Sequence, residues 1–218
     1  RPGIVDRPEL IDRLSALAHV PVVIVSAAAG YGKTTLLALW AEHDERPVAW
    51  VTLDGADDDP VVLLTVLVTA LDPVLHLDST IHQRLQSADP PIDDVILPAL
   101  VNACADADRP FVLVLDDVQQ VVEHDAHAVI GYLAEHLPPG CQIALATRTD
   151  PPLPLASWRA HGRLLELRAS DLSLDDAEAA ELLAASQIRL TDEQLSRLVH
   201  RTDGWCAAIY LATLSLRD

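Results

Sequence analysis

Residues 27–34 read Ala-Ala-Ala-Gly-Tyr-Gly-Lys-Thr, and this stretch decides the fold. It follows a short apolar run rich in β-branched residues, Pro21 to Ser26, and precedes a helical segment, Lys33 to His43. A strand, a glycine-rich turn and a helix that opens with Lys-Thr form the structural context of a P-loop. Backbone N–H groups of such a loop point at phosphate oxygens, and the helix N-terminus adds roughly half a positive charge. The stretch therefore predicts a nucleotide site.

Each residue type in this loop has a physical reason to be there. Gly30 and Gly32 allow backbone conformations that side chains forbid. Lys33 is expected to bridge the β- and γ-phosphates, and the Thr34 hydroxyl to coordinate magnesium. The pattern G-x-x-x-x-G-K-[ST] has Ala27 in place of its first glycine. We expect ATP or ADP with Mg²⁺, bound through Ala29, Gly30, Tyr31, Gly32, Lys33, Thr34 and Thr35.

Two further elements carry chemistry. The run Phe111 to Leu115 is an apolar strand followed by two acids, as in a Walker B element. There Asp116 would hold magnesium, and Asp117 would orient or deprotonate the attacking water. Arg148 ends a later strand, from which it can reach the γ-phosphate. All these residues lie at carboxyl ends of predicted strands, where ligands of open parallel sheets bind. Lys33, Asp117 and Arg148 are thus the expected catalytic residues, with Thr34 and Asp116 the metal ligands.

Strand and helix signals alternate along the chain, which predicts an α/β P-loop NTPase fold. We expect a five-stranded, mostly parallel sheet with helices on both faces, plus a small C-terminal helical domain. The P-loop domain is expected to comprise residues 1–170, and the helical domain residues 171–218. The strands are expected at 21–26, 48–53, 111–115, 141–147 and 163–168. The helices are expected at 7–18, 33–43, 60–71, 93–107, 125–136, 175–185, 191–201 and 205–216, with a further segment at 81–86 and a proline loop at 151–154.

Composition limits the function classes. The net charge of −18 argues against nucleic acid as a partner of this segment, because DNA binding requires Lys and Arg at the phosphates. Arg159, His161, Arg163 and Arg168 are interpreted as solvated residues at the ends of one strand. Of 15 basic residues only Lys33 is lysine, the compact point charge that a phosphate loop needs.

The location and extent of the chain can also be predicted. Three cysteines without CxxC spacing favour a reducing cytoplasm, and offer no zinc site. The longest apolar run, Val61 to Leu71, is too short for a bilayer, so no membrane is expected. Because the chain starts at Arg1 and contains no Met, we expect a piece of a longer protein.

The motifs resemble, in order, those of the STAND class of signal-transduction ATPases, in particular MalT-like, LuxR-type bacterial transcription regulators. The resemblance covers essentially the whole chain and is closest in the loop AAAGYGKTTLLALW at 27–40. The other matching segments are RPEL at 7–10, WVTLD at 50–54 with Asp59-Pro60, VLDD at 114–117, ATR at 146–148, RLLEL at 163–167 and DGWC at 203–206 continuing to Leu216.

The resemblance implies a switch. In this family ADP holds a closed resting state, ATP and an inducer open it to form homo-oligomers, and slow hydrolysis resets it. It implies that Val5 and Arg7 lie near the adenine and that Arg148 senses the γ-phosphate. The parent would add a winged-helix segment, a helical-repeat sensor and a DNA-binding helix-turn-helix. The family's Gly-Trp-Pro proline, which packs near the base, is Cys206 here.

Two alternatives stay open. One is an interaction module that holds nucleotide without catalysis. The other is a small-molecule kinase, which would need an arginine-rich lid over the phosphates. Similar modules also occur in multidomain kinases and cyclase-linked ATPases, so the type of parent is open as well.

Overall fold

The computed structural model describes residues 4–215, with side chains up to Thr213. Five strands form one sheet in the order β2-β3-β4-β1-β5, and every pair of neighbours is parallel. The strands are β1 (Val22–Ser26), β2 (Val48–Thr52), β3 (Val112–Asp116), β4 (Gln142–Thr147) and β5 (Leu164–Arg168). The described sheet is therefore wholly parallel, where the sequence predicted it to be mostly so, and all its carboxyl ends meet at one edge.

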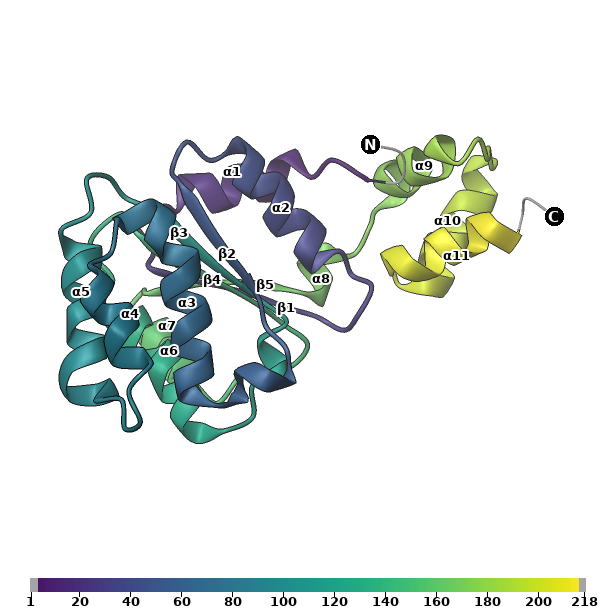
Figure 1. Cartoon of the computed structure of the whole chain (residues 1–218). Helices are drawn as coiled ribbons and strands as arrows, with labels where there is room; N and C mark the ends of the chain where they lie inside the picture. The colour runs from purple at the N-terminus through teal and green to yellow at the C-terminus, as the bar shows by residue number, and fades with distance from the viewer. Residues whose placement is uncertain (1–3, 216–218) are drawn as a thin grey trace.

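The two faces of the sheet are covered by different helices (Figure 1). Alternate residues of a strand point to opposite faces, so Val22 and Ile24 enter one core while Val23 and Val25 enter the other. The first core packs against α3 (Pro60–Leu75), α4 (Ser79–Leu85), α5 (Leu97–Ala105), α6 (His124–His136) and α7 (Leu155–Ala160). The second packs against α1 (Pro8–Ala16), α2 (Lys33–His43) and α8 (Ala169–Leu172).

Short helical turns join these elements: η1 (Gly55–Asp58), the π-helical turn η2 (Ile92–Ile96) and η3 (Val118–Gln120). Two short helices were not predicted. The proline loop at 151–154 continues into α7, because Pro154 stands at the N-cap, where its fixed φ and missing N–H are tolerated. The helix α8 follows β5 directly, and Asp171 caps its start by accepting from the Arg168 N–H. The helix α3 runs on to Leu75 although Pro73 lies inside it.

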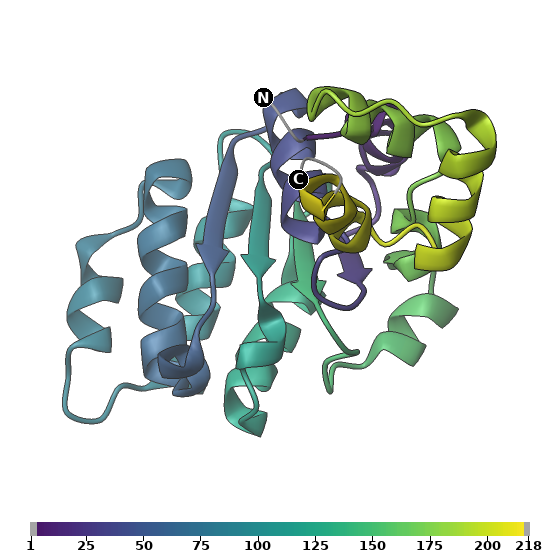
Figure 2. The same ribbon diagram turned by 90° about the vertical axis from the view of Figure 1, so that its right-hand side faces the viewer.

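The C-terminal helices α9 (Asp176–Ala185), α10 (Asp192–Thr202) and α11 (Cys206–Ser215) form a separate small unit. Figures 1 and 2 show it beside the sheet, on the side away from α3–α6. It has its own core, made of Leu174, Ala179, Leu182 and Ile209 together with Val5 from the start of the chain. The N-terminal segment thus packs into the helical unit, while the boundary near residue 170 stays a prediction. The predicted end of the last helix, Leu216, lies outside the described residues.

Within residues 4–215, no helix has the length and apolar character needed to cross a lipid bilayer.

Candidate nucleotide site

The loop between β1 and α2 has the backbone of a phosphate-binding turn. Gly30 and Gly32 have φ of 82° and 80°, in the left-handed region that favours glycine. Gly32 is the N-cap of α2, so the helix opens directly behind the loop, and the N–H groups of its first turn have no acceptor within the helix. Residues 28–30 are exposed, whereas Ala27 is buried. The predicted loop residues are therefore brought together at a helix N-terminus.

The Lys33 side chain is folded back against this loop. Its Nζ donates to the Ala27 carbonyl at 2.8 Å and to the Ala28 carbonyl at 3.1 Å, and the residue is only 7 % exposed. Burial lowers the pKa of Lys33, the positive charge of Arg148 lowers it further, and Asp117 and Asp116 raise it. These three side chains therefore lie within electrostatic reach of Lys33, although they come from two other strands.

The two predicted metal ligands are in direct contact. The Thr34 hydroxyl donates to Asp116 Oδ2 at 2.8 Å, and Asp116 is 3 % exposed. Mg²⁺ prefers oxygen ligands and keeps waters and phosphate oxygens in its shell, so one hydroxyl and one carboxylate suffice from the protein. The oxygen donors present at Thr34 and Asp116 fit this ion.

Asp117 follows with a left-handed backbone, at φ 59° and ψ 39°, and begins η3. Its Oδ1 accepts from Gln119 Nε2 at 2.6 Å. The other end of the Gln119 amide, Oε1, accepts from the backbone N–H of Arg148 at 3.0 Å. The strand order explains this meeting, because β4 lies between β3 and β1 and so brings Arg148 between Asp117 and the P-loop. Gln119 was not among the predicted site residues.

An apolar pocket opens beside the P-loop. It is lined by Ile4, Val5, Arg7, Tyr31, Gly32, Thr35, Leu36, Leu39, Leu172, Leu174 and Cys206. The lining comes from the N-terminal segment, α2, the α8 region and the start of α11, which is the kind of largely apolar, concave surface that small ligands use. The predicted base-site residues Val5 and Arg7 thus share one pocket with Tyr31, Thr35 and Cys206, and their contact with adenine stays a prediction.

The start of α11 contacts the P-loop directly. Trp205 Nε1 donates to the Ala29 carbonyl at 2.9 Å, and the Ala207 N–H donates to the Gly30 carbonyl at 3.0 Å. The Trp205 ring also stacks on Tyr31, with centroids 6.5 Å apart. A Cβ added at Gly30 would lie 2.5 Å from Ala207 Cβ. The helical unit therefore rests on the loop that is expected to hold the phosphates.

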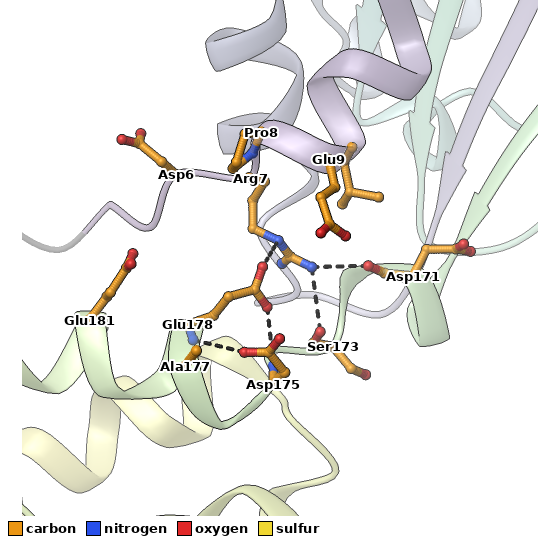
Figure 3. A pocket seen from close by; sticks show the side chains of 11 residues that line it. Asp6, Arg7, Pro8, Glu9, Asp171, Ser173, Asp175, Ala177, Glu178 and Glu181 are labelled. Carbon is orange, nitrogen blue, oxygen red and sulfur yellow. Dashed lines mark hydrogen bonds and ion pairs between the residues drawn. The ribbon is translucent and has the colours of Figure 1, made fainter.

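Arg7 lines both the apolar pocket beside the P-loop and the wider pocket of Figure 3. Its guanidinium donates to the Leu172 carbonyl at 2.9 Å. It also donates to the Asp171 carbonyl at 3.0 Å, and its Nε pairs with Glu178 at 2.6 Å (Figure 3). The wider pocket in Figure 3 is lined by six carboxylates, from Asp6, Glu9, Asp171, Asp175, Glu178 and Glu181. Such a surface repels a polyphosphate. Arg7 instead ties the N-terminal segment to α8 and α9.

The basic cluster near β5 agrees only in part with its interpretation as solvated strand-end residues: Arg159 and His161 are exposed, and Arg163 and Arg168 stand at the two ends of β5, but the arginines are paired. Arg159 lies in α7 and binds Glu166 at 2.7 and 2.9 Å, while Arg168 pairs with Asp150 and Glu166. Arg163 donates to the carbonyls of Ala134 and Glu135 at the end of α6. These arginines hold neighbouring elements together. This argues against the kinase alternative, which would need them in a lid over the phosphates.

This cluster predicts a pH dependence of stability. Hydrogen bonding by Arg159 is the main cause that lowers the pKa of Glu166 from 4.5 to about 2; burial opposes it and Arg168 adds to it. A carboxyl with a depressed pKa stabilises the fold above its unfolded pKa, and this contribution is lost as pH falls toward 2. Glu166→Gln is therefore expected to flatten the loss of unfolding free energy between about pH 5 and about pH 3, measured by urea titration. Glu45→Gln, at an exposed position, is the control and should behave as wild type; equal slopes for all three proteins would contradict the prediction.

Fold and site together define a P-loop ATPase domain. Residues 5–146 match the family described as AAA ATPase domain, and the chain belongs to that family. The resemblance to MalT-like STAND ATPases is confirmed. Over 217 residues the chain is 31% identical to the HTH-type transcriptional regulator MalT of Yersinia enterocolitica, covering 97% of this chain and 24% of that protein. It is also 31% identical over 223 residues to the serine/threonine-protein kinase PknK of Mycobacterium tuberculosis, covering 99% of this chain and 20% of that protein.

Solved structures agree on the fold. A STAND protein with a tetratricopeptide repeat sensor from Pyrococcus horikoshii superposes with a TM-score of 0.67 at 17% identity, over 96% of this chain and 29% of that chain. A Walker-type ATPase of Pyrococcus abyssi gives 0.61 at 15% identity, over 99% of this chain and 68% of that chain. The chain thus spans between a fifth and a quarter of the curated relatives it matches, which are larger multidomain regulators.

Proposed function

We propose that this chain is an ATP/ADP switch in which the helical unit responds to the state of the P-loop, and that slow Mg²⁺-dependent hydrolysis resets the switch. The observation that carries the proposal is the pair of hydrogen bonds from Trp205 and Ala207 to the carbonyls of Ala29 and Gly30. A loop that rearranges around phosphates changes the orientation of those carbonyls. The position of α11, which is bonded to them, then changes as well. The nucleotide site and the helical unit are therefore mechanically linked.

In the proposed reaction, water attacks the γ-phosphorus, the bond to the β,γ-bridging oxygen breaks, and ADP and phosphate form. Lys33 binds the β- and γ-phosphates, and Arg148 offsets the charge that develops on the γ-phosphoryl oxygens. Asp117 orients the water and takes its proton. Thr34 and Asp116 would hold Mg²⁺, which when bound neutralises charge on the β- and γ-oxygens. Base binding is assigned to the apolar pocket with Val5, Tyr31 and Cys206.

The role of the parent protein is part of the proposal. The relatives include a transcriptional regulator and a protein kinase, and a structural neighbour carries a tetratricopeptide repeat sensor. We propose a cytoplasmic, signal-responsive regulator whose other domains include a winged helix, a helical-repeat sensor and a DNA-binding helix-turn-helix. ATP would promote its homo-oligomerisation. With a net charge of −18, this segment itself is not the part that binds nucleic acid.

Tryptophan fluorescence tests the switch. Mg-ATP and Mg-ADP are expected to give different emission from wild type, because Trp205 is 37% exposed and bonded to the loop. Of the other tryptophans, Trp40 and Trp158 are buried, and half-buried Trp50 bonds to Thr52 within β2. The difference should disappear in Trp205→Phe, which keeps an aromatic ring but lacks the indole that reports the change. If both nucleotides bind with the same emission, the helical unit does not report the nucleotide.

Two further measurements separate the alternatives. Phosphate release no higher than that of Lys33→Ala would favour a nucleotide-holding module without catalysis. Transfer of phosphate to an acceptor in a metabolite screen would favour a kinase instead.

A further inference from the structure

Gln119 joins the end of β3 to the end of β4. Its Nε2 donates to Asp117 Oδ1 at 2.6 Å, and its Oε1 accepts from the Arg148 N–H at 3.0 Å. The orientation of this amide follows from its partners, because a carboxylate can only accept and a backbone N–H can only donate. A flipped amide would lose both bonds. Gln119 is half-buried in η3, a turn short enough to hold the side chain between its partners.

Asp117 is the residue that gains most from such support. Its backbone is left-handed, at φ 59°, and its N–H is already bound to Asp116 Oδ1 at 3.0 Å. The carboxylate rotates about its own side-chain bonds unless a donor fixes it. The bond from Gln119 fixes one oxygen and leaves the other to act on water. A bond to an ionised acceptor is about twice as strong as a neutral one, so it suits this task.

Arg148 gains a link to the same carboxylate. Its backbone N–H donates to Gln119 Oε1 at 3.0 Å, and the same amide donates to Asp117. The main chain at the end of β4 is therefore connected through one amide to the proposed base. A shift of the main chain at Arg148, such as one that accompanies contact of this residue with a γ-phosphate, would move Gln119, and with it Asp117.

We propose that Gln119 is a positioning residue that sets the Asp117 carboxylate according to the position of Arg148. This inference rests on the proposed hydrolysis and names a device that regulates it. Gln119 itself touches neither nucleotide nor water in this scheme. Its effect passes through Asp117, so it belongs to the turnover step and not to binding.

The test compares Gln119→Leu, which removes both bonds, with Gln119→Glu, which keeps the acceptor for the Arg148 N–H but loses the donor to Asp117. The neighbour Gln120 is exposed, and Gln120→Leu is the matched control. Both changes at Gln119 are expected to lower kcat by about tenfold or more, the loss typical of one hydrogen bond to a charged group. The Kd for Mg-ADP should stay at the wild-type value, and Gln120→Leu should match wild type in both. A Gln119→Leu protein with unchanged kcat would overturn the proposal, and so would one that loses kcat and affinity equally.

Amide hydrogen exchange separates this inference from the proposed hydrolysis. The Arg148 N–H should exchange faster in Gln119→Leu and stay protected in Gln119→Glu, because only the second variant keeps the acceptor. If wild type releases no more phosphate than Lys33→Ala, the proposed hydrolysis fails. The exchange result still tests the bridge, that is, the two hydrogen bonds that join Gln119 to Asp117 and Arg148. Equal exchange at Arg148 in all the proteins would overturn the bridge even where hydrolysis is measured.

Discussion

Asp117→Asn is expected to lower the rate of ATP hydrolysis by about 100-fold or more, the effect of removing a general base. Asparagine has nearly the same shape, and it tolerates the left-handed backbone that Asp117 adopts at φ 59°. Its Oδ1 still accepts from Gln119, so the local contacts stay. The ability to take a proton is lost together with one negative charge. The Kd for Mg-ATP is therefore expected to stay near that of wild type, while single-turnover phosphate release becomes slow.

Asp108→Asn is the matched control. Asp108 is exposed and precedes β3, so it lies at the opposite end of the strand from Asp117. The substitution Asp108→Asn removes the same charge from the chain without changing the site, so the variant should hydrolyse ATP at the wild-type rate. Hydrolysis by Asp117→Asn at the wild-type rate would show that Asp117 is not the base, and the role would pass to another group near the γ-phosphate.

The sequence predicted the chemistry of the site because that chemistry is local. A strand that ends in a glycine turn with Lys33, and a strand that ends in Asp116, each carry their own signal within about ten residues. Parallel strands then place both at one edge, and the structure brings Thr34 within 2.8 Å of Asp116. The order of the strands was not predicted, and it is this order that puts Arg148 between the other two elements.

The contacts that were missed depend on residues far apart in sequence. Trp205 and Ala29 are separated by 176 positions, and nothing in either segment indicates that an indole N–H will meet a loop carbonyl. The placement of Arg7 near the base stays a prediction, but the bond from its guanidinium to the Leu172 carbonyl, 165 positions along the chain, was not expected. Gln119 lies only two residues beyond Asp117, yet no sequence pattern indicates which groups a glutamine in a turn will contact. Its partner on β4 is known only once the sheet is assembled.

Lys33→Ala is expected to weaken the binding of Mg-ATP and Mg-ADP by roughly 10- to 150-fold, since a hydrogen bond to a charged group contributes about 1.5–3 kcal/mol. The side chain is buried and held by two loop carbonyls, so its loss also frees the loop that shapes the phosphate site. Lys33→Met keeps most of the buried stem but loses the charge and both bonds to the loop carbonyls, so it separates the packing of the stem from the action of the ammonium group. Isothermal titration of nucleotide-free protein measures all the variants.

Charge alone is controlled by Arg201→Ala, which removes a positive charge from an exposed position of α10. It should bind nucleotide as wild type does. If Lys33→Met weakens binding as much as Lys33→Ala, the ammonium group accounts for the loss, through its bonds to the phosphates and to the loop carbonyls together. If Lys33→Met binds as wild type, the ammonium group is not needed for binding, and packing of the buried stem is the part of Lys33 that matters. The lysine would then stabilise the loop, and the backbone N–H groups at the start of α2 would carry the phosphates without it.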